Sequence, residues 1–327
     1  MDYTSAITEL LYAYSAYFIV FAVGLLTTFI YTPKLIKKAT DRGYIVKDMY
    51  KKGKPNVPNL GGLSILVGVM TSLIVAQFLV EHTVSHNLLV FYFMVFSYAL
   101  FGLMDDLLDV GRKMKIYVPF FLSLPILLLT DNNLPMWLGI ADTDMGLLYL
   151  IIAPMYIMVV SNLVNMHSGF NGLSCGLSYI VLVFTVIKVA MGEHPENIMY
   201  ILPVFGSILA FLYFETYPAR IFWANIGSLM VGAAVGGFIV LNHLELFGII
   251  IMIPHIINFL MYVVWKIKKI GEVKFGGLRE DGTLIVPNPL TFKWLFPYYY
   301  RLTEHQTMWI MYAITMFFGM IALIIVP

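Results

Sequence analysis

The sequence predicts an all-α, polytopic membrane protein with about ten transmembrane helices. Of its 327 residues, 60% are hydrophobic and 12% are charged, and the mean hydropathy is +0.84. Soluble domains do not have this composition. Because no long soluble segment is appended, residues 1–327 are expected to form a single transmembrane domain. A spanning helix needs about 20 mostly apolar residues, and such stretches lie near 14–33, 60–80, 88–104, 115–131, 146–164, 172–191, 199–215, 226–242, 245–265 and 307–326.

The distribution of Lys and Arg predicts which connectors face the cytosol, where these residues accumulate. The connectors after the odd-numbered stretches hold 19 of the 20 Lys and Arg residues. The opposite connectors are short or acidic, for example at 130–133, 142–144 and 193–196. Both termini are therefore expected outside. Five loops are expected to meet on the cytosolic side and form the active site, at about 34–59, 105–115, 165–171, 216–225 and 266–306.

Two smaller observations limit the chemistry and the processing of the chain. Cys175 is the only cysteine, which excludes an internal disulfide and a metal site built from several cysteines. It is expected to be a small packed residue. The first apolar stretch lacks the basic start and small-residue cleavage pattern of a removed signal peptide, so it is expected to remain.

The first motif is a pair of carboxylates at a predicted membrane edge. Asp105 and Asp106 end the apolar run 88–104, and a basic cluster that includes Lys115 follows within ten residues. Carboxylates at such a position are costly and usually functional. They supply hard oxygen ligands or a proton acceptor, while a nearby cation holds phosphate. The pair predicts phosphoryl chemistry at a membrane surface. For the cations from Lys34 to Arg42, a purely topological role is favoured.

The connector after the fifth stretch is rich in amides and glycines. Asn162 and Asn165 are three positions apart, so a continuing helix would place both on one face. Their carbonyl oxygens can coordinate a hard cation, and their amides can hold phosphate. Glycines such as Gly169 allow close approach of the backbone to a ligand. A polar turn with helix caps is an equally weighted alternative. His167 taken alone is more typical of a solvated loop residue than of a metal ligand.

Two later connectors carry aromatic and turn-forming residues. Phe222 or Trp223 can stack on a base, because every base presents a π-face. The alternative is an interfacial aromatic anchor, which is favoured more for Trp223. The segment 266–306 contains Gly-Gly and Asp-Gly pairs that favour tight turns. It is expected to be a partly ordered substrate loop with a short hairpin.

Taken together and in order, these motifs resemble those of the polyprenyl-phosphate N-acetylhexosamine-1-phosphate transferases (glycosyltransferase family 4). The resemblance covers nearly the whole chain and is greatest to the eukaryotic, dolichyl-phosphate-using branch, in a compact form that suggests an archaeal member. The matching segments are Asp105-Asp106-Leu-Leu-Asp109 with Lys115, Asn162-Leu-Val-Asn165 with Gly169-Phe-Asn171-Gly172-Leu173, Phe214-x-x-Tyr217-Pro218-Ala-Arg220-Ile-Phe222, and Pro254-His-Ile-Ile-Asn258-Phe259-Leu260.

The resemblance implies a reaction and a set of site residues. A polyprenyl or dolichyl phosphate from the bilayer would attack the β-phosphorus of UDP-GlcNAc, with Mg²⁺ or alternatively Mn²⁺ as cofactor. GlcNAc-diphosphate-polyprenol and UMP would result, as the first step of lipid-linked glycan assembly such as N-glycosylation. The implied roles are catalytic for Asp105, Asp106 and Lys115, metal-binding for Asn165 and Asn225, and substrate-binding for Asn162, Gly169, Asn171, Phe222, Lys274 and Arg279.

The chain also departs from the family pattern. Ala224-Asn225 stands where the family has Gly-Asp, and that Asp is a principal metal ligand. The neutral amide of Asn225 should weaken Mg²⁺ binding. Lys274 and Arg279 are assigned in place of an Arg-His-Arg motif that the last loop lacks.

Several alternatives therefore stay open. The chain could use another UDP-N-acetylhexosamine, or it could be a catalytically impaired binder of nucleotide sugar or lipid phosphate. A transporter is a further alternative, since intramembrane Asp and Asn also mark ion pathways. Direct attack and a two-step mechanism are not distinguished. A multi-pass protein of the archaeal cell membrane is expected, or of the endoplasmic reticulum if the chain is eukaryotic, with a cytosolic active site. A homodimer is plausible, and no nucleic-acid partner is expected.

Overall fold

Long apolar runs interrupted by Gly, Pro and polar clusters fold into a bundle of helices. The computed structural model describes the backbone of residues 3–130, 135–137, 142–269, 271 and 273–327. The α-helices are α1 (Tyr3–Asp41), α2 (Gly62–Ala76), α3 (His82–Leu108), α4 (Met114–Leu122), α5 (Tyr149–Met166), α6 (Leu173–Met191), α7 (Leu202–Glu215), α8 (Ala224–Leu241), α9 (Glu245–Ile251), α10 (Ile253–Ile267), α11 (Phe292–Tyr299) and α12 (Glu304–Ile325). Short 3₁₀ helices occupy Leu124–Leu128, Gly146–Leu148 and Pro195–Tyr200.

Helices occupy all ten of the predicted apolar stretches, but they differ in length. Among the described residues, six helices are long and apolar enough to cross a membrane, and a seventh crossing results if α9 and α10, which are bent by 66°, are counted as one. The multi-pass, all-helical class is thereby supported. Three apolar segments are shorter, so the tenfold crossing stays a prediction for them: Gly62–Ala76, Met114–Leu128 and Leu202–Glu215. Of the predicted acidic connectors, Asp131, Asn132 and Asn133 lie outside the described residues.

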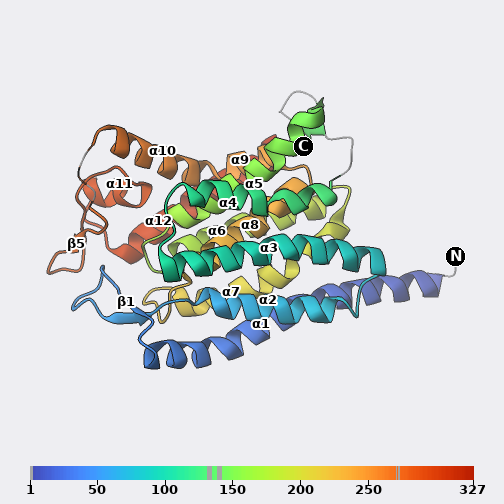
Figure 1. Ribbon diagram of the computed structural model, residues 1–327, viewed down its shortest axis with the longest axis horizontal. Coiled ribbons are helices and arrows are strands. Elements are labelled where there is room, and N and C mark those ends of the chain that lie inside the picture. The colour runs from blue at the N-terminus through green and yellow to red at the C-terminus, as the bar shows by residue number, and fades with distance from the viewer. Residues whose placement is uncertain (1–2, 131–134, 138–141, 270, 272) are drawn as a thin grey trace.

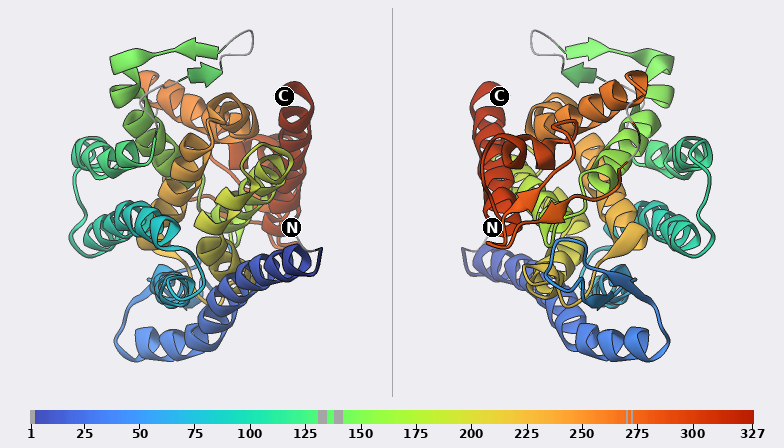
Figure 2. Two further views of the ribbon diagram at one scale, coloured as in Figure 1. Left: turned by 90° about the vertical axis from the view of Figure 1, so that its right-hand side faces the viewer. Right: turned by 90° about the vertical axis from the view of Figure 1, so that its left-hand side faces the viewer.

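Helix α8 lies at the centre of the bundle. Most of its side chains are buried, and α2, α3, α5, α6 and α9 pack against it. A close crossing with α3 depends on Gly102, where an added Cβ would lie 2.5 Å from the backbone oxygen of Asn225. This crossing places the end of α3, with its two aspartates, beside the first turn of α8. End on, α1 lies along one edge of the bundle, and the hairpin of β3 (Pro135–Trp137) and β4 (Asp142–Asp144) lies at the opposite edge (Figure 2).

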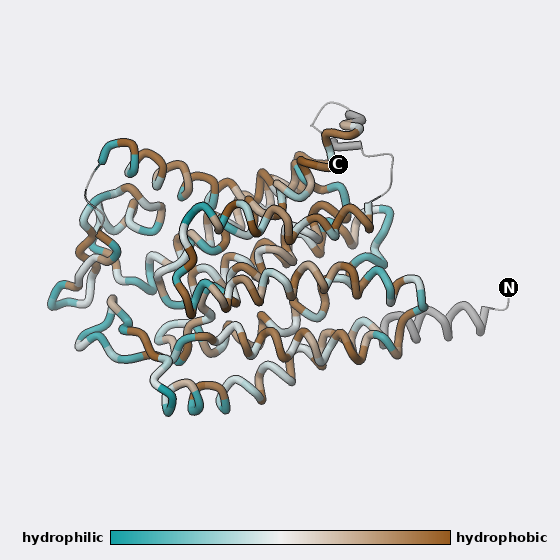
Figure 3. Tube along the Cα trace, in the orientation of Figure 1, coloured by the Kyte–Doolittle hydropathy of each residue, from teal (hydrophilic) through white to brown (hydrophobic). Residues whose placement is uncertain are grey.

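The polar connectors gather at one end of the bundle (Figure 1). Two antiparallel hairpins lie there, one formed by β1 (Ile45–Lys47) and β2 (Asn56–Pro58), the other by β5 (Gly277–Leu278) and β6 (Leu284–Ile285). The second confirms the short hairpin expected in 266–306. Coloured by hydropathy, this end is predominantly hydrophilic and the middle of the bundle hydrophobic, while the C-terminus lies toward the other end (Figure 3).

Backbone hydrogen bonds join these connectors to one another. Phe222 N donates to Pro58 O at 2.9 Å, and Gly61 N donates to Phe222 O at 2.8 Å. The α7–α8 connector therefore continues the edge of the first hairpin. The backbone N–H and C=O of Phe222 are both paired with this segment, which fixes the position of the residue. Phe222 thereby forms part of one wall of the site described next.

Candidate functional site

Asp105, Lys115 and Asn225 form a charged cluster at the junction of α3, α4 and α8. Asp105 is 4% exposed, and its Oδ2 lies 2.7 Å from Lys115 Nζ. The same oxygen accepts a 2.7 Å hydrogen bond from Asn225 Nδ2. Its other oxygen accepts from Val110 N at 3.0 Å. Asp105 is thus fully paired, whereas the side chain of Lys115 is 29% exposed and Asn225 is half-buried.

Asp106 has a different role from its neighbour. Its two carboxylate oxygens accept hydrogen bonds from the backbone N–H groups of Asn225 and Ile226, each at 3.0 Å. These are among the first N–H groups of α8, which have no partner within the helix. A carboxylate there satisfies both donors and complements the positive end of the helix dipole, an effect of about 0.5–2 kcal/mol. Asp106 therefore fixes the start of α8 and with it the position of Asn225.

A cavity of about 340 Å³ lies beside this cluster. The structure brings together both predicted metal ligands and three predicted substrate residues. The cavity is lined by Asn165 and Asn225 of the first kind, and by Gly169, Asn171 and Phe222 of the second. Other lining residues come from the first hairpin loop, 46–50. The cavity is thus built from four of the five predicted loops.

The amides at the end of α5 are placed as the helical spacing predicts. The helix continues to Met166, so Asn162 and Asn165 lie within it. Asn162 Nδ2 donates to Lys115 O at 3.1 Å, which ties α5 to the charged cluster. Asn165 Oδ1 accepts a 3.0 Å hydrogen bond from Ser228 Oγ on α8. Asn162 thus supports the cluster, whereas Asn165 lines the cavity.

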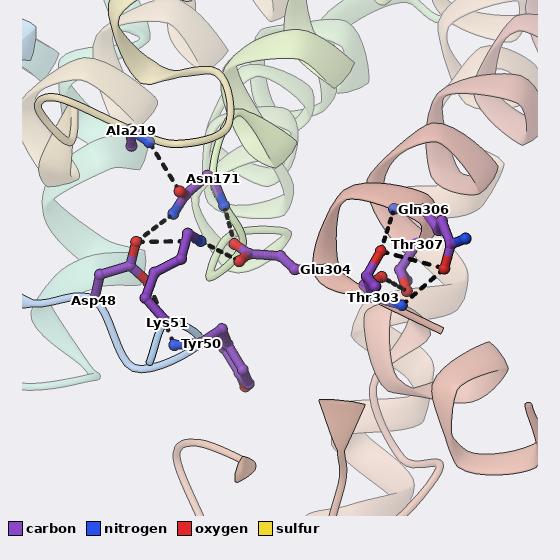
Figure 4. A network of polar contacts seen from close by, with 9 residues as sticks. All are labelled: Asp48, Tyr50, Lys51, Asn171, Ala219, Thr303, Glu304, Gln306 and Thr307. Carbon is purple, nitrogen blue, oxygen red and sulfur yellow. Dashed lines mark hydrogen bonds and ion pairs between the residues drawn. The ribbon is translucent and has the colours of Figure 1, made fainter. Parts of the chain in front are cut away.

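Asn171 is held by its side-chain amide and by its backbone N–H (Figure 4). Its Nδ2 donates to Asp48 Oδ2 at 3.1 Å, its Oδ1 accepts from Ala219 N at 2.9 Å, and its backbone N donates to Glu304 Oε1 at 2.7 Å. Because Ala219 N can only donate and Asp48 can only accept, the orientation of the amide is fixed. Lys51 forms ion pairs with both Asp48 and Glu304.

The start of α12 supports this network through a capping box. Thr303 Oγ1 accepts from Gln306 N at 3.2 Å, and Gln306 Oε1 accepts from Thr303 N at 3.0 Å. Such reciprocal caps fix the first turn of a helix, and Glu304 lies in that turn. Sequence reasoning missed Asp48 and Glu304, and it treated Lys51 only as a topology signal. The Thr303-to-Gln306 capping pattern was the one local signal available.

Besides Asn162, two more of the predicted substrate residues lie outside the cavity. Lys274 is exposed in the last loop, and neither it nor Arg279 lines the cavity. Arg279 Nη1 instead donates to Leu284 O at 2.5 Å, and its backbone N donates to Thr283 O at 2.8 Å. This arginine completes the β5–β6 hairpin. Contact of either residue with substrate stays a prediction.

Two expectations about neighbouring residues are wrong. His167 is not solvated: it is 1% exposed, its ring lies 4.7 Å from that of His255, and burial lowers its pKa well below the usual value. Trp223 is 4% exposed and lines the cavity, so it is not an interfacial anchor. The first difference arises because the His167 ring packs against His255 of α10 and Phe292 of α11. Cys175 is a buried free thiol, as expected.

The donor set fits Mg²⁺ in type but not in charge. Asn165 and Asn225 offer the hard oxygens that Mg²⁺ prefers, and both line one cavity. Beside the cavity, Asp105 is engaged with Lys115 and Asp106 with α8. Of the two carboxylates that line it, Asp48 pairs with Lys51, and Glu215 accepts from Trp223 N through one of its two oxygens. Within the part of the chain that the structure describes, no group of three His, Cys, Asp or Glu residues gathers as a metal site. An ion held there would therefore draw most of its negative ligands from a bound diphosphate.

Comparison with known proteins finds one matching family profile and several similar transferases. Residues 88–243 match the profile described as glycosyl transferase family 4. The chain is 26% identical over 313 residues to a candidate UDP-N-acetylglucosamine–dolichyl-phosphate N-acetylglucosaminephosphotransferase of Saccharolobus solfataricus, covering 93% of this chain and 94% of that one. A protein of Sulfolobus acidocaldarius with the same description is 27% identical over 92% and 94%. The phospho-N-acetylmuramoyl-pentapeptide-transferase of Acetivibrio thermocellus is 30% identical over 63% and 64%.

Proposed function

Because the chain belongs to glycosyl transferase family 4, whose profile spans its residues 88–243, we propose that it transfers GlcNAc-1-phosphate from UDP-GlcNAc to a polyprenyl phosphate such as dolichyl phosphate. The observation that carries the proposal is the cavity in which Asn165, Asn171, Phe222 and Asn225 meet beside the Asp105–Lys115 pair. It combines an aromatic face, amide donors and acceptors, and a cation at the end of an apolar bundle. Those are the groups that a nucleotide diphosphate and a lipid phosphate require.

Different residues bind the uracil and neutralise the charge of the phosphates. Phe222 stacks on the uracil. The Asn171 amide hydrogen-bonds the uracil edge with the N–H and the lone pair that its contacts to Asp48 and Ala219 leave over. Lys115 neutralises phosphate charge, and Asp105 holds its ammonium in place. An oxygen of the lipid phosphate attacks the β-phosphorus, the bond from that phosphorus to the bridging oxygen breaks, and UMP leaves with the electron pair. Positioning and charge stabilisation are the main contributions a protein makes to such a transfer.

Asn165 and Asn225 would hold Mg²⁺ against the diphosphate. When bound, the ion would neutralise charge on the leaving UMP. Ser228 Oγ, which donates to Asn165 Oδ1, orients that amide and leaves its second lone pair available. The hydrogen bond from Asn225 Nδ2 to Asp105 likewise turns Asn225 Oδ1 away from the carboxylate. This chain therefore keeps its site ordered by amide hydrogen bonds where the family pattern has a third carboxylate.

The proposal is tested by measuring UMP release and lipid-linked GlcNAc with purified protein, UDP-GlcNAc, a polyprenyl phosphate and Mg²⁺. Turnover is expected, with loss of activity on chelation of the metal. The Lys115→Met variant should be at least about tenfold slower, because it removes a charge-assisted contact of about 1.5–3 kcal/mol. No turnover with any UDP-N-acetylhexosamine, although UDP-GlcNAc binds, would instead identify a binding protein.

Asn225→Asp should strengthen the binding of Mg²⁺. The new carboxylate would lie beside Asp105, in place of an amide donor 2.7 Å away, and like charges repel without a cation between them. We expect the Mg²⁺ concentration for half-maximal activity to fall about tenfold, and the thermal stability of the variant to rise with Mg²⁺ more than that of the parent. Equal Mg²⁺ dependence of both melting temperatures would show that residue 225 does not contact the ion.

A further inference from the structure

Lys293 is a cation for which the proposed reaction has no role. It lies on α11, far in sequence from the other site residues, and its Nζ donates a 2.7 Å hydrogen bond to Ser168 O. The ammonium also lies 5.7 Å from the centre of the Phe170 ring. Burial lowers the pKa of this lysine to about 8, and the nearby Glu304 carboxylate opposes the shift. A cation withdrawn from water is costly unless it is well paired, and the hydrogen bond to Ser168 O replaces part of the lost hydration.

The contact determines the orientation of the peptide between Ser168 and Gly169. This peptide is trans, and in a trans peptide the carbonyl and the following N–H point in opposite directions. With Ser168 O held by Lys293, Gly169 N–H therefore points away from the lysine. Ser168 and Gly169 line the cavity, whereas Lys293 does not. The N–H is thus directed to the cavity side, and no hydrogen bond among the described residues uses it.

The glycine is required by the same arrangement. Gly169 has φ +111°, which side chains disfavour. An added Cβ would lie 2.1 Å from Lys293 Nζ, so the amine occupies the space of a side chain. Lys293 can therefore approach the turn this closely only because residue 169 is a glycine. One side of the turn contacts the amine, and the other side lines the cavity.

We propose that Lys293 is a positioning residue that turns the Gly169 N–H into the cavity, where it donates a hydrogen bond to an oxygen of the bound uridine nucleotide. The inference rests on the proposed function and assigns to the last loop a part in nucleotide binding. Lys293 does so without touching the substrate, through the Ser168 carbonyl. Glu304 contributes from the other side of the turn by holding Asn171 N. Two residues of the region 293–304 thus orient successive backbone groups of the turn 168–171.

The experiment compares UDP binding, by calorimetry in detergent, to the parent chain and three variants. Lys293→Met removes the donor and should weaken UDP binding about tenfold, the effect of about one hydrogen bond to a ligand. Lys293→Gln keeps a donor and should recover part of the affinity. Lys38→Met, on the exposed surface of α1, is the matched control and should bind UDP as the parent does.

Turnover separates positioning from general damage. In Lys293→Met, the KM for UDP-GlcNAc should rise, while kcat and the KM for the lipid phosphate stay within about twofold, because the lost contact stabilises ground and transition states alike. An equal loss for both substrates, accompanied by a lower melting temperature, would overturn the proposal in favour of a structural role. UDP affinity within about twofold of the parent would overturn it as well.

A measurement on the parent chain covers the case in which Lys293→Met does not fold. UDP should slow amide hydrogen exchange in the peptide that contains 168–171, and unchanged exchange at saturating UDP would overturn the inference. If the parent bound no UDP, the proposed function would fail together with this inference. UDP binding that is insensitive to Lys293→Met would refute the inference alone.

Discussion

At the scale of single residues, Ala224 has a backbone conformation that its side chain disfavours. Its φ is +59°, in the left-handed region that costs a residue other than glycine about 1–2 kcal/mol. The next residue, Asn225, is held by Asp105 and Asp106 through its side chain and its backbone N–H. The contacts that place Asn225 in the cavity therefore impose the strain on its neighbour.

Ala224→Gly should relieve this strain. We expect the free energy of unfolding to rise by about 1 kcal/mol and the melting temperature in detergent by a few degrees, because glycine adopts this φ without steric cost. Ala234→Gly, in the buried middle of the same helix, is the matched control and should lower stability by about 1 kcal/mol. If both variants melted at lower temperature than the parent, Ala224 would not be strained.

At the scale of elements, the first loop and the start of α12 are joined by charge. Lys51 and Glu304 are 12% and 3% exposed at their side chains, and they are paired directly. Removing one partner of a buried ion pair leaves an uncompensated charge and costs about 3–5 kcal/mol, whereas removing both is often nearly neutral. The pair fixes Asn171 and thereby one wall of the cavity, so its loss should affect nucleotide binding as well as stability.

A double-mutant cycle tests this coupling. Lys51→Met and Glu304→Gln should each lower the melting temperature, with Glu304→Gln the milder of the two because its amide oxygen can still accept from Asn171 N. The double variant should be more stable than the sum of the single losses predicts, with a coupling free energy above about 1 kcal/mol. Strictly additive losses would mean that the two residues act independently.

At the scale of the whole molecule, the sequence predicts the helices better than it predicts the site. Composition and apolar length predict helices in all ten stretches, because each spanning segment must satisfy the hydrogen bonds of its own backbone N–H and C=O groups. The motif residues Asp105, Lys115 and Asn225 meet as their spacing and order suggest. Pairs such as Lys51 with Glu304 depend on how distant loops fold together, and local pattern carries no signal for them. The same holds for Lys293 and Gly169.

The sidedness of the membrane is the remaining prediction of the whole chain. Nineteen of the 20 Lys and Arg residues lie in the five connectors, with the helix ends beside them, that are predicted to face the cytosol. Four of these connectors line the cavity, so the distribution predicts a cytosolic cavity. Lys54, in the first hairpin loop, is exposed at the end that carries the cavity, and Glu193, in the turn after α6, is exposed and lines a pocket with Pro327 at the other.

Labelling with a membrane-impermeant maleimide can decide the orientation. The single native cysteine, Cys175, is buried, so the parent chain is the unlabelled control. In intact cells, Glu193→Cys should be modified, while Lys54→Cys should be modified only after the membrane is permeabilised. The opposite pattern would place the cavity outside the cell, where cytosolic UDP-GlcNAc could not reach it, and would contradict the proposed function without changing the fold.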